Sequence, residues 1–265
     1  MSHDLRHDPN PSIHSDSSPF PNPIGHNLAS RLREGTRQSH TSAENTAYMK
    51  CFLKGVVVPV AFQKLLANLY WIYDAMEAEF DRLQDHPILR QIHFSELRRS
   101  ENLAQDLAFF YGEDWQDCIT PNGAGLTYVM RIHLMARDRP ERLVAHAYVR
   151  YLGDLSGGQG LRKIVRSALN LPADRGTGLY EFSALPTPEA KRDFKMHYRD
   201  VLNALPLSET EVLGIIEEAN LAFQLNCNLV HSLEPHIQAA IDPQQFAQIT
   251  NDSHQGSTEL VEVGR

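Results

Sequence analysis

The chain has 265 residues and a formal net charge of −8, and this acidic balance argues against a nucleic-acid-binding protein, which would usually be basic. Hydrophobic residues make up 42% and charged residues 22% of the chain, the proportions of an ordinary soluble globular protein. No run of about 18 consecutive apolar residues occurs, so we expect no transmembrane helix and no membrane association.

Two terminal segments differ in composition from the rest. Residues 1–26 are rich in Pro, Ser, Asp and His and poor in aliphatic side chains, which predicts a disordered extension. This extension lacks the apolar segment of a signal peptide, and it is too acidic for a transit peptide. Residues 243–265 are predicted to form a second, shorter flexible tail, which leaves 27–242 as one domain.

The three cysteines also bear on the compartment. Cys51, Cys118 and Cys227 lie far apart and form no CxxC pair. An odd number of widely spaced cysteines predicts neither a disulfide framework nor covalent attachment of a cofactor. We therefore expect a soluble protein of a reducing, cytoplasmic compartment.

The first predicted helical segment, residues 32–45, places a histidine among charged and polar side chains. Arg33, Thr36, Arg37 and Glu44 all lie within about 60° of His40 on one helical face. A metal-ligating imidazole usually gives its second N–H to an oxygen acceptor, and Glu44 could supply one. The arginines could pair with carboxylates of the same ligand. The alternative is a solvated face with charge pairs one turn apart, which explains the charges but not the histidine.

The middle of the chain reads as helices. Apolar residues recur at helical spacing in three segments that end at turn residues: 59–84, 95–112 and 125–138. A further helix starts at Pro140, because proline fits the first turn of a helix. Several alternating, β-branched runs bounded by turns are not found, so the pattern predicts a single all-α domain.

The segment "RYLGDLSGGQGLRKI", residues 150–164, interrupts this helical pattern with four glycines: Gly153, Gly157, Gly158 and Gly160. Each glycine in a helix interior costs about 1 kcal/mol relative to alanine. On a helical wheel, Gly153, Gly157 and Gly160 form one bare stripe and Gly158 lies on its flank. A bare stripe allows a close approach of either another helix or a flat ligand. Asp154 lies among the glycines, and the whole pattern favours a functional bend over a flat surface.

Two helical segments complete the domain. Residues 187–205 carry a cluster of cations on one helix: Lys191, Arg192, Lys195 and Arg199. These cations either form a solvated face or meet an anion. Residues 208–237 open with Ser208 and Glu211, the S-x-x-E pattern of a capping box.

Four motifs together resemble the haem oxygenase family over roughly residues 27–240. They are "AHAYVRYLGDLSGGQ" (145–159), "TRQSHTSAEN" (36–45), "FKMHYR" (194–199) and "EEANLAFQLN" (217–226). The first resembles the distal-helix signature of the family and the second its proximal-helix signature. Further stretches look most like the soluble, ferredoxin-dependent enzymes of photosynthetic microbes. The implied fold is a single helical domain with haem between a proximal and a kinked distal helix.

The resemblance also implies roles for individual residues. His40 would be the axial ligand of the haem iron, with Glu44 behind it. The residues implied to contact the rest of the haem, its propionates included, are Arg33, Thr36, Arg37, Tyr148, Lys195, Arg199, Phe223 and Asn226. Asp154 would hold water on the distal side, and Gly153 and Gly157 would lie over the iron. Two departures from the family pattern, Val149 and Val230, bear on the shape of the pocket.

The activity implied is the oxidative cleavage of haem b, which is both substrate and prosthetic group. With O2 as co-substrate, the products would be biliverdin, of the IX-alpha isomer, carbon monoxide and Fe(II). The chain carries no flavin or nicotinamide fingerprint, so electrons would come from reduced ferredoxin or another one-electron reductase. A basic rim of Arg33, Arg37, Arg192 and Lys195 would steer such an acidic donor. A bilin reductase that consumes the product is a further expected partner.

Other readings remain beside this one. A ferritin-like di-iron protein would need Glu-x-x-His on two helices, and this chain has no such motif. Thiaminase-like and quinone-cofactor enzymes use a similar scaffold but need no histidine face together with a glycine stripe. The serious alternative is a non-catalytic haem-binding or haem-storage protein that keeps the pocket without turnover.

Overall fold

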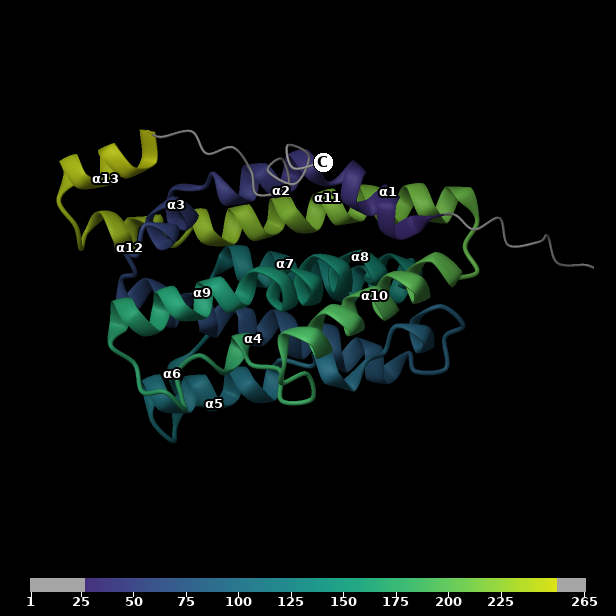
Figure 1. Cartoon of the computed structure of the whole chain (residues 1–265), viewed down its shortest axis with the longest axis horizontal. Coiled ribbons are helices and arrows are strands. Elements are labelled where there is room, and N and C mark those ends of the chain that lie inside the picture. The colour runs from purple at the N-terminus through teal and green to yellow at the C-terminus, as the bar shows by residue number, and fades with distance from the viewer. Residues whose placement is uncertain (1–26, 252–265) are drawn as a thin grey trace, which may run out of the picture.

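The computed structural model describes residues 27–251, which contain helices and turns but no strand. The α-helices are α1 Leu28–Gly35, α2 Arg37–Glu44, α3 Ala47–Leu53, α4 Pro59–Arg82, α5 Ser100–Tyr111, α6 Trp115–Cys118, α7 Gly123–Asp138, α8 Leu143–Ala147, α9 Gly153–Leu169, α10 Pro188–Ala204, α11 Glu209–His231, α12 Glu234–Gln238 and α13 Pro243–Asn251. Figure 1 shows them in three stacked rows, with α1, α2, α3 and α11 in one row, α7 to α10 in the middle, and α4 and α5 in the third. The predicted all-α fold is confirmed.

The core is organised around α4, the longest helix. Proline at its first position starts it, and its apolar side chains recur on more than one face. Phe62, Ile72, Tyr73 and Met76 are fully buried against neighbouring helices, chiefly α5 and α7. Each such side chain contributes about 1.5–3 kcal/mol when it leaves water. No helix within residues 27–251 is both long and apolar enough to cross a membrane.

The helix that carries much of the site, α11, begins as its sequence predicts. Ser208 and Glu211 form the reciprocal capping box at its start. Further along, the buried Glu218 accepts hydrogen bonds from Arg131 of α7 and lies 3.1 Å from Nε2 of His146 in α8. Burial alone would raise the pKa of Glu218, but the hydrogen bonds from Arg131 and His146 lower this pKa to about 2. The ionised carboxylate therefore ties α11 to α7 and α8.

The C-terminal boundary of the domain differs from the prediction. Residues 243–251, expected to be part of a flexible tail, form α13 and pack against α3. Asp242 accepts hydrogen bonds from the backbone N–H groups of Gln244 and Gln245, and Lys50 Nζ donates to the Thr250 carbonyl at 2.8 Å. The polar stretch carries only two large apolar residues that contact the core, so its periodicity is weak. The predictions for residues 1–26 and 252–265 lie outside the described part of the chain.

Candidate haem site

The predicted proximal segment is two short helices held against α11. Their junction is at Thr36, whose buried hydroxyl donates to the Leu32 carbonyl at 2.7 Å. A Cβ on Gly35 would come within 2.7 Å of Ile216 Cγ2, so the backbone of α1 touches α11 directly. Asn220 of α11 donates to the Gly35 carbonyl at 3.0 Å. These contacts fix where α2 starts and therefore which way its side chains point.

His40 lies on α2 with one ring nitrogen lacking a close partner. Its side chain is 35% exposed, and its Nδ1 is 3.7 Å from Oε2 of Glu44, one turn on. This Nδ1 is buried and makes no hydrogen bond within the described residues. The ring meets Phe223 edge-on, with the centroids 5.7 Å apart. A protonated Nδ1 directed at Glu44 would leave Nε2 as the free ligand atom, which is the arrangement that a metal-ligating histidine needs.

The distal segment is a helix with a local change of pitch. A π-helical turn, Tyr148–Leu152, joins α8 to α9, and such turns are often found at functional sites because they re-aim the helix that follows. A Cβ added at Gly153, Gly157 or Gly160 would meet no atom within 4 Å. By contrast, a Cβ on Gly158 would come within 2.9 Å of the Tyr180 ring. Helix packing therefore accounts for the glycine on the flank, whereas the predicted bare stripe faces open space.

Asp154 lies at the start of α9 inside a buried polar group. The Tyr73 hydroxyl donates to Asp154 Oδ2, and Nη2 of Arg150 lies 3.8 Å from Oδ1. Arg150 also donates to Asn226 Oδ1 at 2.6 Å. Burial raises the pKa of Asp154, while Arg150 and the Tyr73 hydrogen bond oppose the rise. The net result is a pKa of Asp154 above the ordinary aspartate value.

Two members of this polar group were not predicted. Arg150 lies one turn before Asp154 within the matched distal signature, so its spacing offered a signal. Tyr73 comes from α4, and nothing in its local sequence distinguishes it from a tyrosine of the hydrophobic core. Only the fold brings it to Asp154.

A cationic cluster forms where α1, α10 and the π-helical turn meet. Burial raises the pKa of Tyr148, while a hydrogen bond with Thr36 and the charges of Arg199 and Arg33 oppose the rise. Burial lowers the pKa of Lys195, and Arg199 lowers it further. Among residues 27–251, no carboxylate lies within ion-pairing distance of Arg33, Lys195 or Arg199. The cluster therefore suits an anionic ligand.

The structure thus gathers most predicted site residues into three groups. His40, Glu44 and Phe223 form one, Asp154 and Asn226 share another through Arg150, and the cationic cluster is the third. Phe223 and Asn226 are three residues apart on α11, so the His40 group and the Asp154 group flank the same turn of that helix. Arg37 is exposed on α2. Val149 and Val230 are buried, and the individual roles of all these residues remain predictions.

Comparisons with known proteins point to one family. A family model described as "Heme oxygenase" matches residues 26–232. "Heme oxygenase 2" of Synechocystis sp. is 54% identical over 88% of this chain and 93% of its own length, and "Heme oxygenase" of Porphyra purpurea is 48% identical over 79% and 88%. The crystal structure of heme oxygenase-2 from Synechocystis sp. in complex with heme and NO superposes with a TM-score of 0.87 at 54% identity and covers 88% of this chain and 96% of that one.

Proposed function

The chain belongs to the haem oxygenase family, and from that premise we propose that it binds haem b and cleaves it oxidatively to biliverdin, carbon monoxide and Fe(II). One observation carries the proposal. His40, whose buried Nδ1 is unsatisfied and lies beside a carboxylate, contacts Phe223 of α11, and Asp154, beside the bare stripe of α9, is linked through Arg150 to Asn226 three residues further along α11.

The residues present fit haem. His40 would hold the iron through Nε2, with Glu44 setting the ring orientation. Arg33, Lys195 and Arg199, which lack carboxylate partners among the described residues, would pair with the propionates. The open stripe of Gly153, Gly157 and Gly160 leaves room for a flat ring against backbone. When bound, haem supplies the iron that activates O2 and the ring that is opened.

The distal residues then direct the outcome. Because α9 has no side chain on its open stripe, it would place no acid or base at the iron. The haem ring itself would then be the nearest group that can be oxidised. Asp154 is held at both oxygens, by Tyr73 and Arg150, and so can orient a water on that open face. Its raised pKa suits proton delivery through that water, which is general acid catalysis at one remove. The cationic cluster fixes the rotation of the ring and thereby the IX-alpha outcome.

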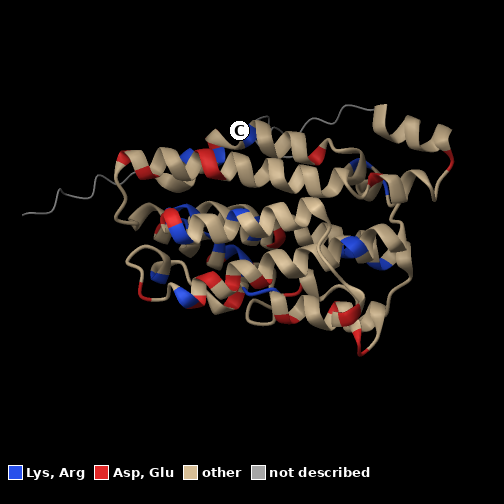
Figure 2. Cartoon of the chain, turned by 180° about the vertical axis from the view of Figure 1, so that it is seen from behind, with Lys and Arg blue, Asp and Glu red and all other residues tan. Residues whose placement is uncertain are grey.

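The electron donor we propose is reduced ferredoxin. Figure 2 shows Asp and Glu concentrated along the row that contains α4 and α5, whereas the predicted basic rim, Arg33, Arg37, Arg192 and Lys195, belongs to α1, α2 and α10. A local positive surface on an otherwise acidic protein would steer a small acidic partner to the haem edge. We place the reaction in the reducing cytoplasm, because the three cysteines are free.

The function is tested by adding haem to the purified protein and then supplying reduced ferredoxin or ascorbate in air. We expect the Soret band to decay and the spectrum of biliverdin to replace it. A stable haem spectrum under both reductants would instead identify the protein as a non-catalytic haem-binding or storage protein.

The donor is tested separately with Arg192→Glu, a residue of the rim outside the cofactor-binding set. We expect ferredoxin-supported turnover to fall and ascorbate-supported turnover to stay unchanged. Lys64→Glu, at an exposed lysine of α4, makes the same charge change away from the rim and serves as the control. An equal response of both variants with ferredoxin would rule out the rim as the docking surface.

A further inference from the structure

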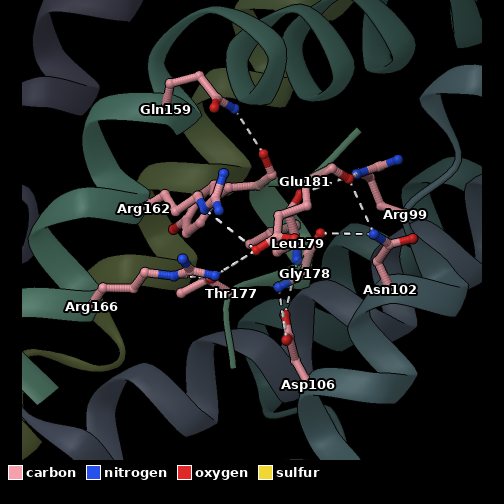
Figure 3. Close-up of polar contacts among 11 residues, drawn as sticks. Arg99, Asn102, Asp106, Gln159, Arg162, Arg166, Thr177, Gly178, Leu179 and Glu181 are labelled. Carbon is pink, nitrogen blue, oxygen red and sulfur yellow. Dashed lines mark hydrogen bonds and ion pairs between the residues drawn. The ribbon is translucent and has the colours of Figure 1, made fainter. Parts of the chain in front are cut away.

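A short segment between α9 and α10 connects the distal helix to the rest of the domain. It comprises residues 177–182 and includes the 3-10 turn Gly178–Tyr180. Figure 3 shows its polar contacts, with α9 on one side and α5 on the other. Thr177, Leu179, Tyr180 and Phe182 are all buried, so the segment is part of the core and not a surface loop.

On the α5 side, one carboxylate fixes the backbone of the turn. Oδ1 of the buried Asp106 accepts from the N–H of Gly178 and Oδ2 accepts from the N–H of Leu179, both at 2.8 Å. Asn102 donates to the Gly178 carbonyl at 2.9 Å and to the Glu181 carbonyl at 3.1 Å. A Cβ on Gly178 would come within 3.1 Å of the Asn102 carbonyl, so the backbone of the turn rests directly on α5.

Just before α5, Arg99 adds a third attachment. Its guanidinium donates to the Glu181 carbonyl and lies 3.9 Å from the centroid of the Phe182 ring. Arg99 is itself 3% exposed. The carbonyls of Gly178 and Glu181 and the N–H groups of Gly178 and Leu179 are therefore held by side chains from the α5 side.

On the α9 side, the same segment receives side chains from about two helical turns. Gln159 donates to the Tyr180 carbonyl at 2.8 Å, and the Tyr180 ring packs against Gly158. Arg166 donates to Thr177 Oγ1 at 3.0 Å and to Glu181 at 2.8 Å, and Arg162 lies 3.3 Å from the same carboxylate. These contacts lie behind the bare stripe, on the side of α9 that carries side chains.

From these contacts we propose that residues 177–182 form a brace that sets the position of the bare face of α9, with Asp106 as the positioning residue that holds the brace to α5. Apart from the π-helical turn before it, α9 packs mainly on this segment and on α3. The bare face of α9 has no side chains that could change its position relative to a ligand. That position is therefore set by the residues that pack against the opposite side of the helix. The role at the haem rests on the proposed function, whereas the mechanical coupling of Asp106 to α9 does not.

The proposal is tested with Asp106→Asn, which keeps the shape of the side chain but leaves one acceptor for two backbone N–H groups. In the haem-free protein we measure amide hydrogen exchange by mass spectrometry. Loss of one buried hydrogen bond is worth about tenfold in a local opening equilibrium, so exchange across α9 should rise about tenfold while exchange in α4 stays unchanged. Glu101→Gln, at an exposed carboxylate of the same helix, is the matched control and should leave α9 unchanged.

A second variant and a second readout separate positioning from general stability. Gln159→Ala removes only the bond to the Tyr180 carbonyl and should raise exchange in α9 alone, by less than Asp106→Asn. In the ferric haem complex, both variants should bind imidazole several-fold more tightly, because this bulky ligand must fit under α9. If exchange rises equally in α4 and α9, or if neither variant changes exchange in α9, there is no brace. Failure of the protein to take up haem would refute the proposed function and leave the exchange result standing.

Discussion

The two helices that would enclose the haem are built on opposite plans. The proximal helix α2 buries none of its side chains, and it contributes one imidazole positioned by Glu44 and Phe223. The distal helix α9 contributes a bare stripe and is crowded behind by Tyr180, Glu181 and Thr177. Two neighbouring side chains are enough to orient a single ligand atom. A surface of backbone must be held by a scaffold, and Arg99, Asp106 and Thr177 are buried in the contacts of the segment behind α9.

The largest expected effect breaks the proximal half of this comparison. His40→Ala removes the only side chain of α2 proposed to bind iron, so turnover should be abolished while haem still binds through the cationic cluster. Adding imidazole should restore part of the activity by filling the vacated ligand position. The measurements are the absorption spectrum of the haem complex and the rate of biliverdin formation with and without imidazole.

The control for that variant is His133→Ala, which removes an exposed histidine paired with Glu79 on the surface. It should leave both the spectrum and the rate unchanged. Full activity of His40→Ala without imidazole would show that another residue ligates the iron.

The next effect breaks the distal half. Asp154→Ala should leave iron ligation unchanged, because the aspartate is proposed to act through water and its side chain is bound to Tyr73 and Arg150. Turnover should fall by about 10²–10⁴, the contribution of a positioned proton-transfer group. Peroxide-driven oxidation of added phenols should rise in compensation, since the protein would resemble a weak peroxidase. Asp154→Asn keeps the shape and some hydrogen bonding, so its rate should lie between those of the wild-type protein and Asp154→Ala. A wild-type rate in Asp154→Ala would show that the aspartate takes no part in the mechanism.

The third effect concerns pH and sharpens the comparison, because the pKa values of two buried carboxylates, one in each region, are shifted in opposite directions. Burial raises the pKa of Asp106, behind α9, to about 6, against hydrogen bonds from Leu179 and Gly178. The folded state then keeps a proton that the unfolded state loses, so the free energy of unfolding falls as pH rises from about 4 to 6, by at most about 3 kcal/mol. Glu218, in the α11 frame that holds α2, has its pKa lowered to about 2. Its contribution of about 3 kcal/mol is present above the ordinary glutamate pKa and is lost as pH falls towards 2.

Urea unfolding at a series of pH values measures both contributions. Asp106→Asn should remove the decline between about pH 4 and 6, and Glu218→Gln should remove the rise between about pH 2 and 4.5. If the two substitutions alter the same part of the stability curve, the assignment of opposite shifts is wrong.

The same contrast explains how far the sequence could go. His40 and Glu44 are one turn apart, and the glycine stripe lies within a single helix, so helical spacing was enough to find both. Tyr73 comes from α4 and Asp106 from α5, and each reads locally as part of an ordinary amphipathic helix. Their contacts with Asp154 and with residues 177–182 depend on which helices pack together, and spacing along one helix does not encode that. The start of α13 was missed for another reason, because a short polar helix is stabilised by contacts with α3 and hardly by its own pattern.

The smallest expected effect compares two adjacent glycines of α9, one on each face. Alanine at either position gains about 1 kcal/mol of helix propensity. In Gly157→Ala nothing opposes this gain, since the new Cβ meets no atom within 4 Å, so the haem-free protein should melt a few degrees higher. In Gly158→Ala the Cβ would lie 2.9 Å from the ring of the buried Tyr180, and overpacking of this kind costs about 1–3 kcal/mol, so the melting temperature should not rise and is expected to fall.

The haem affinities of the two variants should follow the reverse order. The methyl group of Gly157→Ala enters the face proposed to cover the ring, whereas Gly158→Ala leaves that face bare. Calorimetry of the haem-free proteins and titration with haem give the two orders independently. If both variants were stabilised and bound haem alike, the two faces of α9 would not differ in the way that the structure indicates.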